Sequence, residues 1–264
     1  MTDFETIELE IDELNRIVIV YLNRPNQYNA FNIKMVDELI NAFNTISDNE
    51  KIRCLILTGR GKAFCAGGDV VEFKNAIKPD TFMDNLVSRL HTGIKILKRM
   101  KQITIAAVNG ACFGAGLGYA AACDFRISVE NATFGCAFTR IGLSPDSSST
   151  WHLPKLVGLS LANEMLFLNR ILNAEEALKF HLVNKVSTSQ KFFQDLKEFA
   201  VEISKGAPMA FSLTKNLLKE SYYNSLETHL DREAEFIVKT AGTEDFQEGL
   251  KAFFEKRNPD FKGV

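Results

Sequence analysis

The chain has 264 residues, of which 46% are hydrophobic and 24% charged, a composition typical of a soluble globular protein. Its 31 basic and 33 acidic residues give a formal net charge of −2, so it lacks the basic excess that nucleic acid binding requires. The sequence has no apolar run of roughly 20 residues that would span a membrane. Its acidic first residues do not resemble a signal peptide, so we expect a cytoplasmic protein.

The 5 cysteines show no CxxC spacing, and the 4 histidines stand far apart in the sequence. We therefore expect the cysteines to be reduced and to pack as small hydrophobic residues. No local group of metal ligands is visible, so we expect neither a metal site nor a bound cofactor.

The first half of the chain alternates short β-branched runs with stretches of helical periodicity. Strands are predicted at 16–22, 54–58, 103–108 and 125–129, and helices at 33–47, 81–100 and through 122 after a glycine turn at 109–110. Strands separated by helices of this length favour an α/β layer arrangement with parallel strands.

The second half is predominantly helical. Helices are predicted at 153–167, 174–180, 192–204, 207–223, 226–240 and 244–256, with one strand at 182–187. We therefore divide the chain into an α/β core at 1–200 and a helical C-terminal region at 201–264. On one helix of that region, the apolar residues Leu230, Ala234, Ile237 and Val238 predict a face that packs on its own core or on another subunit.

Two glycine-bearing segments follow buried strands. In the first, residues 61–70, small residues with free amides would let the backbone approach a ligand closely. The second, residues 109–118, opens a helix, whose first amides are unpaired and favour negative charge. It lacks the GxGxxG spacing of a dinucleotide site. Taken singly, each segment is also explained as a tight turn or a close helix contact.

A third segment, residues 134–151, contains Asp146 followed by four hydroxyl residues. Asp in this position is typical of a helix N-cap, which is the structural interpretation of the segment.

In this order and spacing, the three segments resemble the crotonase family, which includes enoyl-CoA hydratases and isomerases. The resemblance extends to Leu22-Asn23-Arg24-Pro25 and to residues 248–261, and so covers essentially the whole chain. It implies an α/β spiral of ββα units with a helical C-terminal trimerisation region. It also implies an acyl-CoA thioester as the substrate, and a homotrimer or a dimer of trimers as the assembly.

By the same resemblance, the amides of Gly68 and Ala115 hold the thioester oxygen. Family members more often have glycine at the second position, but a backbone donor survives a methyl side chain. Such donors stabilise a developing enolate oxygen more than a neutral carbonyl. The residues implied along the CoA path are Arg24, Lys62, Ala63, Ala66, Asp69 and Val70, with Phe254 and Lys256 reaching it from a neighbouring subunit.

The subclass is argued from the acid and base residues. The two glutamates of the family's hydratases correspond here to Gly118 and Phe138, neither of which can move a proton. Asp146 instead stands where isomerases resembling 1,2-epoxyphenylacetyl-CoA isomerase carry an aspartate, and a single base suffices to shift a double bond. Phe138, Leu143 and Trp151 are expected around it in the substrate pocket. The serines that follow Asp146 would hold its pKa down by hydrogen bonding.

Three alternatives remain open at this point. Asp146 would act as a nucleophile, with His91 nearby, in a dehalogenase or thioesterase of the same family. A hydratase-type reaction and a non-catalytic CoA-binding protein are the other two. The sequence leaves open the acyl group, the pathway (fatty acid metabolism or aromatic degradation), the choice between trimer and hexamer, and the role of His91.

Overall fold

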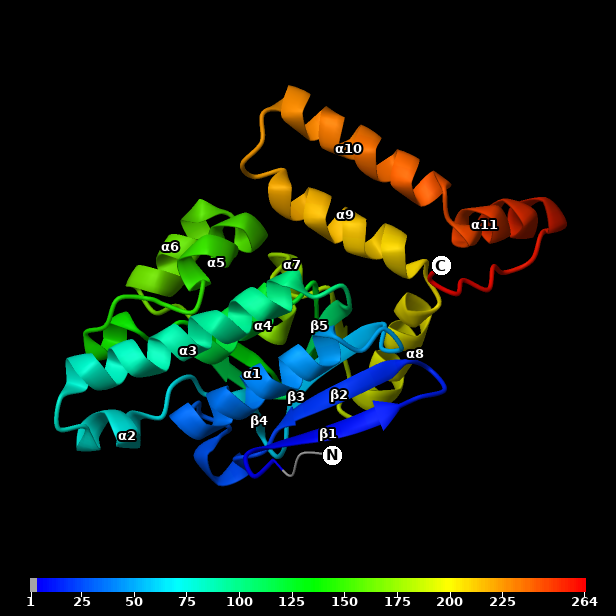
Figure 1. Ribbon diagram of the computed structural model, residues 1–264. Coiled ribbons are helices and arrows are strands. Elements are labelled where there is room, and N and C mark those ends of the chain that lie inside the picture. Colours follow the sequence, from blue (N-terminus) through cyan, green and yellow to red (C-terminus); the bar gives the residue numbers. More distant parts are fainter. Residues whose placement is uncertain (1–3) are drawn as a thin grey trace.

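The computed structural model describes residues 4–264, which form an α/β core followed by helices that extend away from it (Figure 1). The core contains two sheets, and the chain passes from one to the other repeatedly.

The larger sheet has six strands in the order β1-β2-β3-β5-β7-β10. Its strands are β1 (Ile7–Asp12), β2 (Ile17–Leu22), β3 (Cys54–Gly59), β5 (Ile103–Val108), β7 (Phe125–Val129) and β10 (Lys185–Ser187). Among its described strands, β1 and β2 pair antiparallel and the others pair parallel. The β3 and β5 strands are buried along their whole length, which explains why they read as continuous apolar runs rather than alternating ones.

The smaller sheet has four strands in the order β4-β6-β8-β9. These are β4 (Ala63–Cys65), β6 (Ala111–Phe113), β8 (Thr133–Gly135) and β9 (Leu172–Asn173). The first three each follow directly after a strand of the larger sheet, and helices follow in turn, which produces a spiral of ββα units. The α/β spiral of ββα units predicted from the sequence is therefore confirmed, although the short strands of this sheet were not predicted.

Eight α-helices belong to the described core. They are α1 (Ile33–Ser47), α2 (Val70–Asn75), α3 (Pro79–Arg99), α4 (Ala115–Ala122), α5 (Ser149–Val157), α6 (Leu159–Phe167), α7 (Ala174–Lys179) and α8 (Phe192–Ser204), with short 3-10 turns at Pro25–Gln27 and Thr139–Ile141. Every residue of α4 is buried, and six of its eight residues are Ala or Gly.

Among the element boundaries that differ from those predicted, two lie between residues 153 and 187. The helix predicted at 153–167 is two helices, because Gly158 has a φ of 78° that interrupts the α conformation. The predicted strand at 182–187 begins only at Lys185. Helix α8 packs on the larger sheet through Phe192, Leu196 and Ala200, and continues past the predicted core boundary to Ser204.

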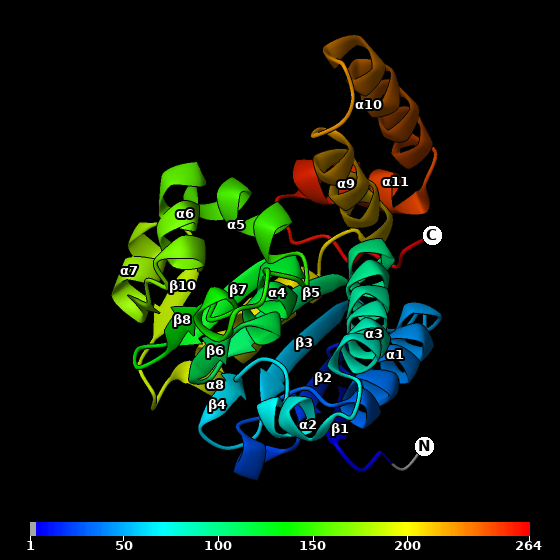
Figure 2. The same cartoon turned by 90° about the vertical axis from the view of Figure 1, so that its left-hand side faces the viewer.

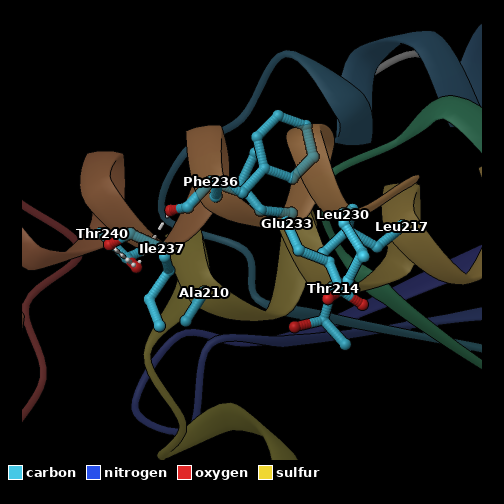
Figure 3. A pocket seen from close by; sticks show the side chains of 10 residues that line it. Ala210, Thr214, Leu217, Leu230, Glu233, Phe236, Ile237 and Thr240 are labelled. Carbon is cyan, nitrogen blue, oxygen red and sulfur yellow. Dashed lines mark hydrogen bonds between the residues drawn. The ribbon is translucent and has the colours of Figure 1, made fainter. Parts of the chain in front are cut away.

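Three further helices form the C-terminal region: α9 (Pro208–Glu220), α10 (Leu226–Ala241) and α11 (Glu244–Glu255). In both views α10 lies on the far side of α9 from the core (Figures 1 and 2). Leu230, Ala234 and Ile237 line a groove of about 480 Å³ between α9 and α10 (Figure 3), yet Leu230 and Ile237 stay largely exposed. Among residues 4–264, no helix is both long enough and apolar enough to cross a membrane.

Candidate active site

The first glycine turn follows β4 and presents a free amide. The backbone N–H of Phe31 donates to the carbonyl of Gly67 (2.7 Å), and the N–H of Asp69 donates to the carbonyl of Phe31 (2.9 Å). These two bonds flank Gly68, whose own N–H donates to no acceptor within residues 4–264. Gly67 has a φ of 104°, a conformation that only glycine adopts readily, so the turn depends on this residue.

The second free amide belongs to Ala115, the first residue of α4. Gly114 precedes it with a φ of 52°, and the Ala115 N–H has no acceptor in the described part of the chain. A β-carbon added to Gly67 would lie 3.6 Å from the Ala115 nitrogen, so the two segments touch through their backbones. Two unpaired donors, one of them at a helix N-terminus, can stabilise a negative oxygen placed between them.

Asp146 lies in the loop before α5 and is half-buried. Its Oδ1 atom is buried and has no hydrogen-bond partner among residues 4–264. Burial raises the pKa of this carboxyl above its ordinary value, while the Ser147 hydroxyl and the His91 imidazole act in the opposite direction. The effect of Ser147 has the expected sign, but burial outweighs it.

The expectation that Asp146 caps a helix is wrong. The N-cap of α5 is Ser148, and no side chain among the described residues caps this helix. Ser147 and Ser148 have φ values of 49° and 64°, so the chain turns sharply through two left-handed residues directly after Asp146. Such backbone strain is found at functional sites, where the surrounding structure over-determines it.

A chain of hydrogen bonds holds this turn. The Ser148 hydroxyl donates to the Ser147 carbonyl (2.5 Å), and Nδ1 of His152 lies 2.9 Å from the Ser148 Oγ. The His152 imidazole thereby fixes the backbone that carries Asp146.

Gly118 leaves no room for a side chain. A β-carbon at this position would lie 2.1 Å from the Ser147 carbonyl oxygen and 2.8 Å from the Ser147 Cβ. The loop after Asp146 therefore occupies the space that a longer residue on α4 would need. The tip of the Phe138 ring would lie 3.9 Å from a β-carbon on Gly114, which places this aromatic ring beside the start of α4.

The residues predicted along the CoA path are only partly gathered together. Arg24 and Asp69 form an ion pair (2.8 Å), and Asp69 also caps α2, so both side chains hold this segment in place. Near them Lys62, Ala66 and Val70 are exposed, whereas Ala63 is buried.

The two C-terminal residues predicted on that path lie elsewhere. Phe254 and Lys256 are exposed at the end of α11, which lies away from α2 in both views (Figures 1 and 2). Within one chain they do not join the other predicted residues, and their contribution from a neighbouring subunit stays a prediction.

The residues predicted around the substrate separate into two groups. His91 on α3 acts electrostatically on Asp146. Leu143 is half-buried in the loop that contains Asp146. Trp151 instead packs against Tyr222 and lines a cleft that faces α9, which Asp146 does not line.

Sequence reasoning missed Tyr119. This side chain is completely buried in α4, and its hydroxyl donates to the Leu90 carbonyl (2.9 Å), which fastens α4 to α3 beside His91. The only signal in the sequence is a bulky polar-tipped residue in a helix otherwise built mainly of Ala and Gly.

Comparison with known proteins agrees with this geometry. The sequence model of the enoyl-CoA hydratase/isomerase family matches residues 12–264. A Bacillus subtilis protein described as an enoyl-CoA hydratase/isomerase is 36% identical over 249 residues, 94% of this chain and 95% of that protein. The 1,2-epoxyphenylacetyl-CoA isomerase of Escherichia coli is 31% identical over 251 residues, 94% of this chain and 95% of that enzyme. The crystal structure of an enoyl-CoA hydratase from Bacillus anthracis has a TM-score of 0.93 at 32% identity, with 98% of this chain and 100% of that chain covered.

The two-sheet spiral is the fold of the crotonase superfamily. Within that class, the chain belongs to the enoyl-CoA hydratase/isomerase family and is an enzyme of it. The predicted family is thereby confirmed. Because its relatives are named both hydratase and isomerase, the choice of reaction depends on the side chains of the site.

Proposed function

We propose that this enzyme is an acyl-CoA isomerase that shifts a double bond, or isomerises a ring, through a thioester enolate. The amides of Gly68 and Ala115 hold the enolate oxygen. Asp146 removes a proton from one carbon and returns it to another, so that the product has the same mass as the substrate.

The packing of Gly118 against Ser147 is the observation that carries the proposal. A hydratase of this family, as the sequence resemblance implies, needs a glutamate at position 118. Even a β-carbon there would collide with the Ser147 carbonyl at 2.1 Å. With Phe138 at the second glutamate position, Asp146 is the remaining carboxylate that the resemblance assigns to the chemistry.

The environment of Asp146 suits a single acid/base. A general base works best when its pKa lies near the operating pH, and burial shifts the Asp146 pKa in that direction. Such a base contributes on the order of 10²–10⁴-fold to the rate, and removal of one oxyanion donor costs about 3–4 kcal/mol of barrier. The base generates the enolate charge by removing a proton from carbon, and the two amides stabilise that charge on the oxygen.

The same proposal includes the mode of binding and the assembly. The CoA moiety passes the segment of Lys62, Ala66 and Val70, all of which are exposed. Phe254 and Lys256 approach it from a neighbouring subunit of a homotrimer or a dimer of trimers in the cytoplasm. The exposed apolar side chains of α10 and α11 support such an assembly.

A second candidate uses Asp146 as a nucleophile. Its carboxylate would displace a halide from the acyl group, as in a dehalogenase, or the CoA thiolate from the thioester, as in a thioesterase, and so form a covalent intermediate. The electrostatic effect of His91, which lowers the Asp146 pKa, favours it, because a nucleophilic carboxylate must be ionised.

The test is incubation of the purified enzyme with 3-enoyl, 2-enoyl and aryl CoA thioesters, followed by chromatography and mass measurement. An isomeric product of unchanged mass is the expected result. A product heavier by one water would contradict the isomerase proposal. A covalent adduct on Asp146, trapped in a single turnover, would replace it with the second candidate.

A further inference from the structure

A cleft of about 590 Å³ lies between the core and α9. Trp151, Phe211, Leu218 and Tyr222 give it an apolar and aromatic lining. The Trp151 ring lies 5.9 Å from the Tyr222 ring, and the Lys155 ammonium sits 2.9 Å from the Trp151 centroid and 4.4 Å from that of Tyr222. An aromatic wall with a cation at its edge suits an apolar molecule that has a charged end.

Positive charge inside the cleft is not balanced. Lys98, Arg126 and Lys215 line it, and Asp124 is the carboxylate among its lining residues. The Lys215 ammonium lies 2.7 Å from Asp124, whereas that of Lys98 lies 3.8 Å away, beyond hydrogen-bond distance. Asp124 Oδ2 also accepts hydrogen bonds from the backbone N–H and the hydroxyl of Thr104.

Arg126 has no carboxylate partner within residues 4–264. Its side chain is buried, and its guanidinium donates to the carbonyls of Leu182 (2.7 Å) and Cys123 (2.8 Å). Carbonyl dipoles do not cancel a full charge, so the surroundings of this guanidinium favour an added anion.

His152 gives a second indication that positive charge dominates the cleft. The residue is 7% exposed and lines the cleft, and its Nε2 atom has no hydrogen-bond partner in the described chain. Burial lowers the pKa of its imidazole to about 3, and the charges of Lys98, Arg126 and Lys155 lower it further. A neutral imidazole with a free ring nitrogen therefore stands beside the cations.

We propose that this cleft is a second ligand site, which binds a carboxylate carried by an aromatic or medium-length aliphatic body. The carboxylate pairs with Lys98 and Lys155, and the apolar body packs against Phe211 and Leu218, beside the Trp151 ring. Asp146, Gly68 and Ala115 do not line the cleft, so the site does not depend on the proposed reaction.

Trp151 is the single tryptophan of the sequence, so its fluorescence reports occupancy of the cleft without any label. Phenylacetate and octanoate are titrated into the full-length protein, with phenylacetamide and octanamide as neutral analogues. We expect saturable changes in emission with the carboxylates, and binding of the amides that is weaker by at least about tenfold. The tighter of the two acids identifies the body, aromatic or aliphatic, that the site prefers.

Four variants test where the anion binds. Lys98→Gln and the exposed Lys155→Gln each weaken carboxylate binding about tenfold, whereas Lys51→Gln, on the surface elsewhere, leaves it unchanged. Lys155→Gln keeps the test valid should Lys98→Gln fail to fold. The Asp146→Asn variant binds the carboxylate as the unaltered protein does.

Three results would overturn the proposal. These are equal affinity for acids and amides, an emission change that both lysine variants retain in full, and displacement of the carboxylate by acetyl-CoA. The last would make the cleft part of the reaction site rather than a second one.

Discussion

The core helices and the C-terminal helices differ in how much of their apolar surface they bury. Helix α1 has 15 residues and buries Met35, Val36, Leu39, Ala42, Phe43 and Ile46, whereas α10, with 16 residues, buries only Phe236. Both helices are amphipathic in sequence. The core therefore buries its apolar surface within one chain, whereas α9–α11 leave much of theirs exposed, as the proposed assembly requires.

The largest difference between the two regions is expected from one matched pair of substitutions. Phe43 is fully buried and Phe254 is 79% exposed. Phe43→Ala should lower the free energy of unfolding by about 3–5 kcal/mol, and Phe254→Ala by less than about 0.5 kcal/mol. Urea denaturation of both variants measures this. Similar losses in the two would show that α11 is packed as tightly as the core.

Removal of residues 225–264 tests what the exposed surface is for. Deletion takes away one charged hydrogen bond to the core, from Arg53 to the Phe261 carbonyl (2.7 Å), and should cost about 1.5–3 kcal/mol of stability. The core should stay folded, and the oligomer should dissociate in sedimentation or sizing experiments. An unaltered protein that is already monomeric would contradict the proposed assembly.

Gly118→Ala extends the comparison of the two regions to the candidate active site. The added methyl would collide with the Ser147 carbonyl, which should cost about 1–3 kcal/mol of stability and displace Asp146, so that activity falls as well. Gly242→Ala is the matched control, because its nearest neighbour would be at an ordinary 3.6 Å in the C-terminal region. Thermal unfolding and turnover of both variants provide the readout. Full activity in Gly118→Ala would mean that the 118–147 contact is not critical.

The smallest expected effect concerns pH. Because burial raises the pKa of Asp146, the folded state disfavours its ionised form, so Asp146→Asn should stabilise the protein near neutral pH. The gain should shrink as the pH falls toward the ordinary value of 3.8, where the unfolded chain also becomes protonated. Urea midpoints of both proteins across this range measure it. A gain that does not change with pH would have another cause than ionisation.

The main elements of the core could be predicted because their signals are local. Buried runs such as Ile103–Val108 and the helical spacing of Ile33–Ser47 depend on burial of one or both faces. The ordered glycine segments and Asp146 were instead singled out by their resemblance to the crotonase family, because each segment taken singly is also explained as a tight turn or a close helix contact. The three-residue strands β4, β6 and β8 could not be predicted, because no periodicity fits in so few residues.

The direction of single side chains was the least predictable feature of the site. Trp151 stands five positions after Asp146, yet it lines the cleft facing α9. Its orientation is set by the left-handed turn at Ser147–Ser148, and two consecutive serines give no local sequence signal of such a turn. The role of Tyr119 likewise depends on α3, which packs on it from a distant part of the sequence.

The most direct test of the account compares turnover and acyl-CoA affinity in Asp146→Asn and in the unaltered enzyme. We predict that affinity is retained, because the amides of Gly68 and Ala115 are untouched, while the rate of isomerisation falls by at least about 10²-fold. Unchanged turnover in the variant would remove Asp146 from the chemistry and contradict the proposed mechanism.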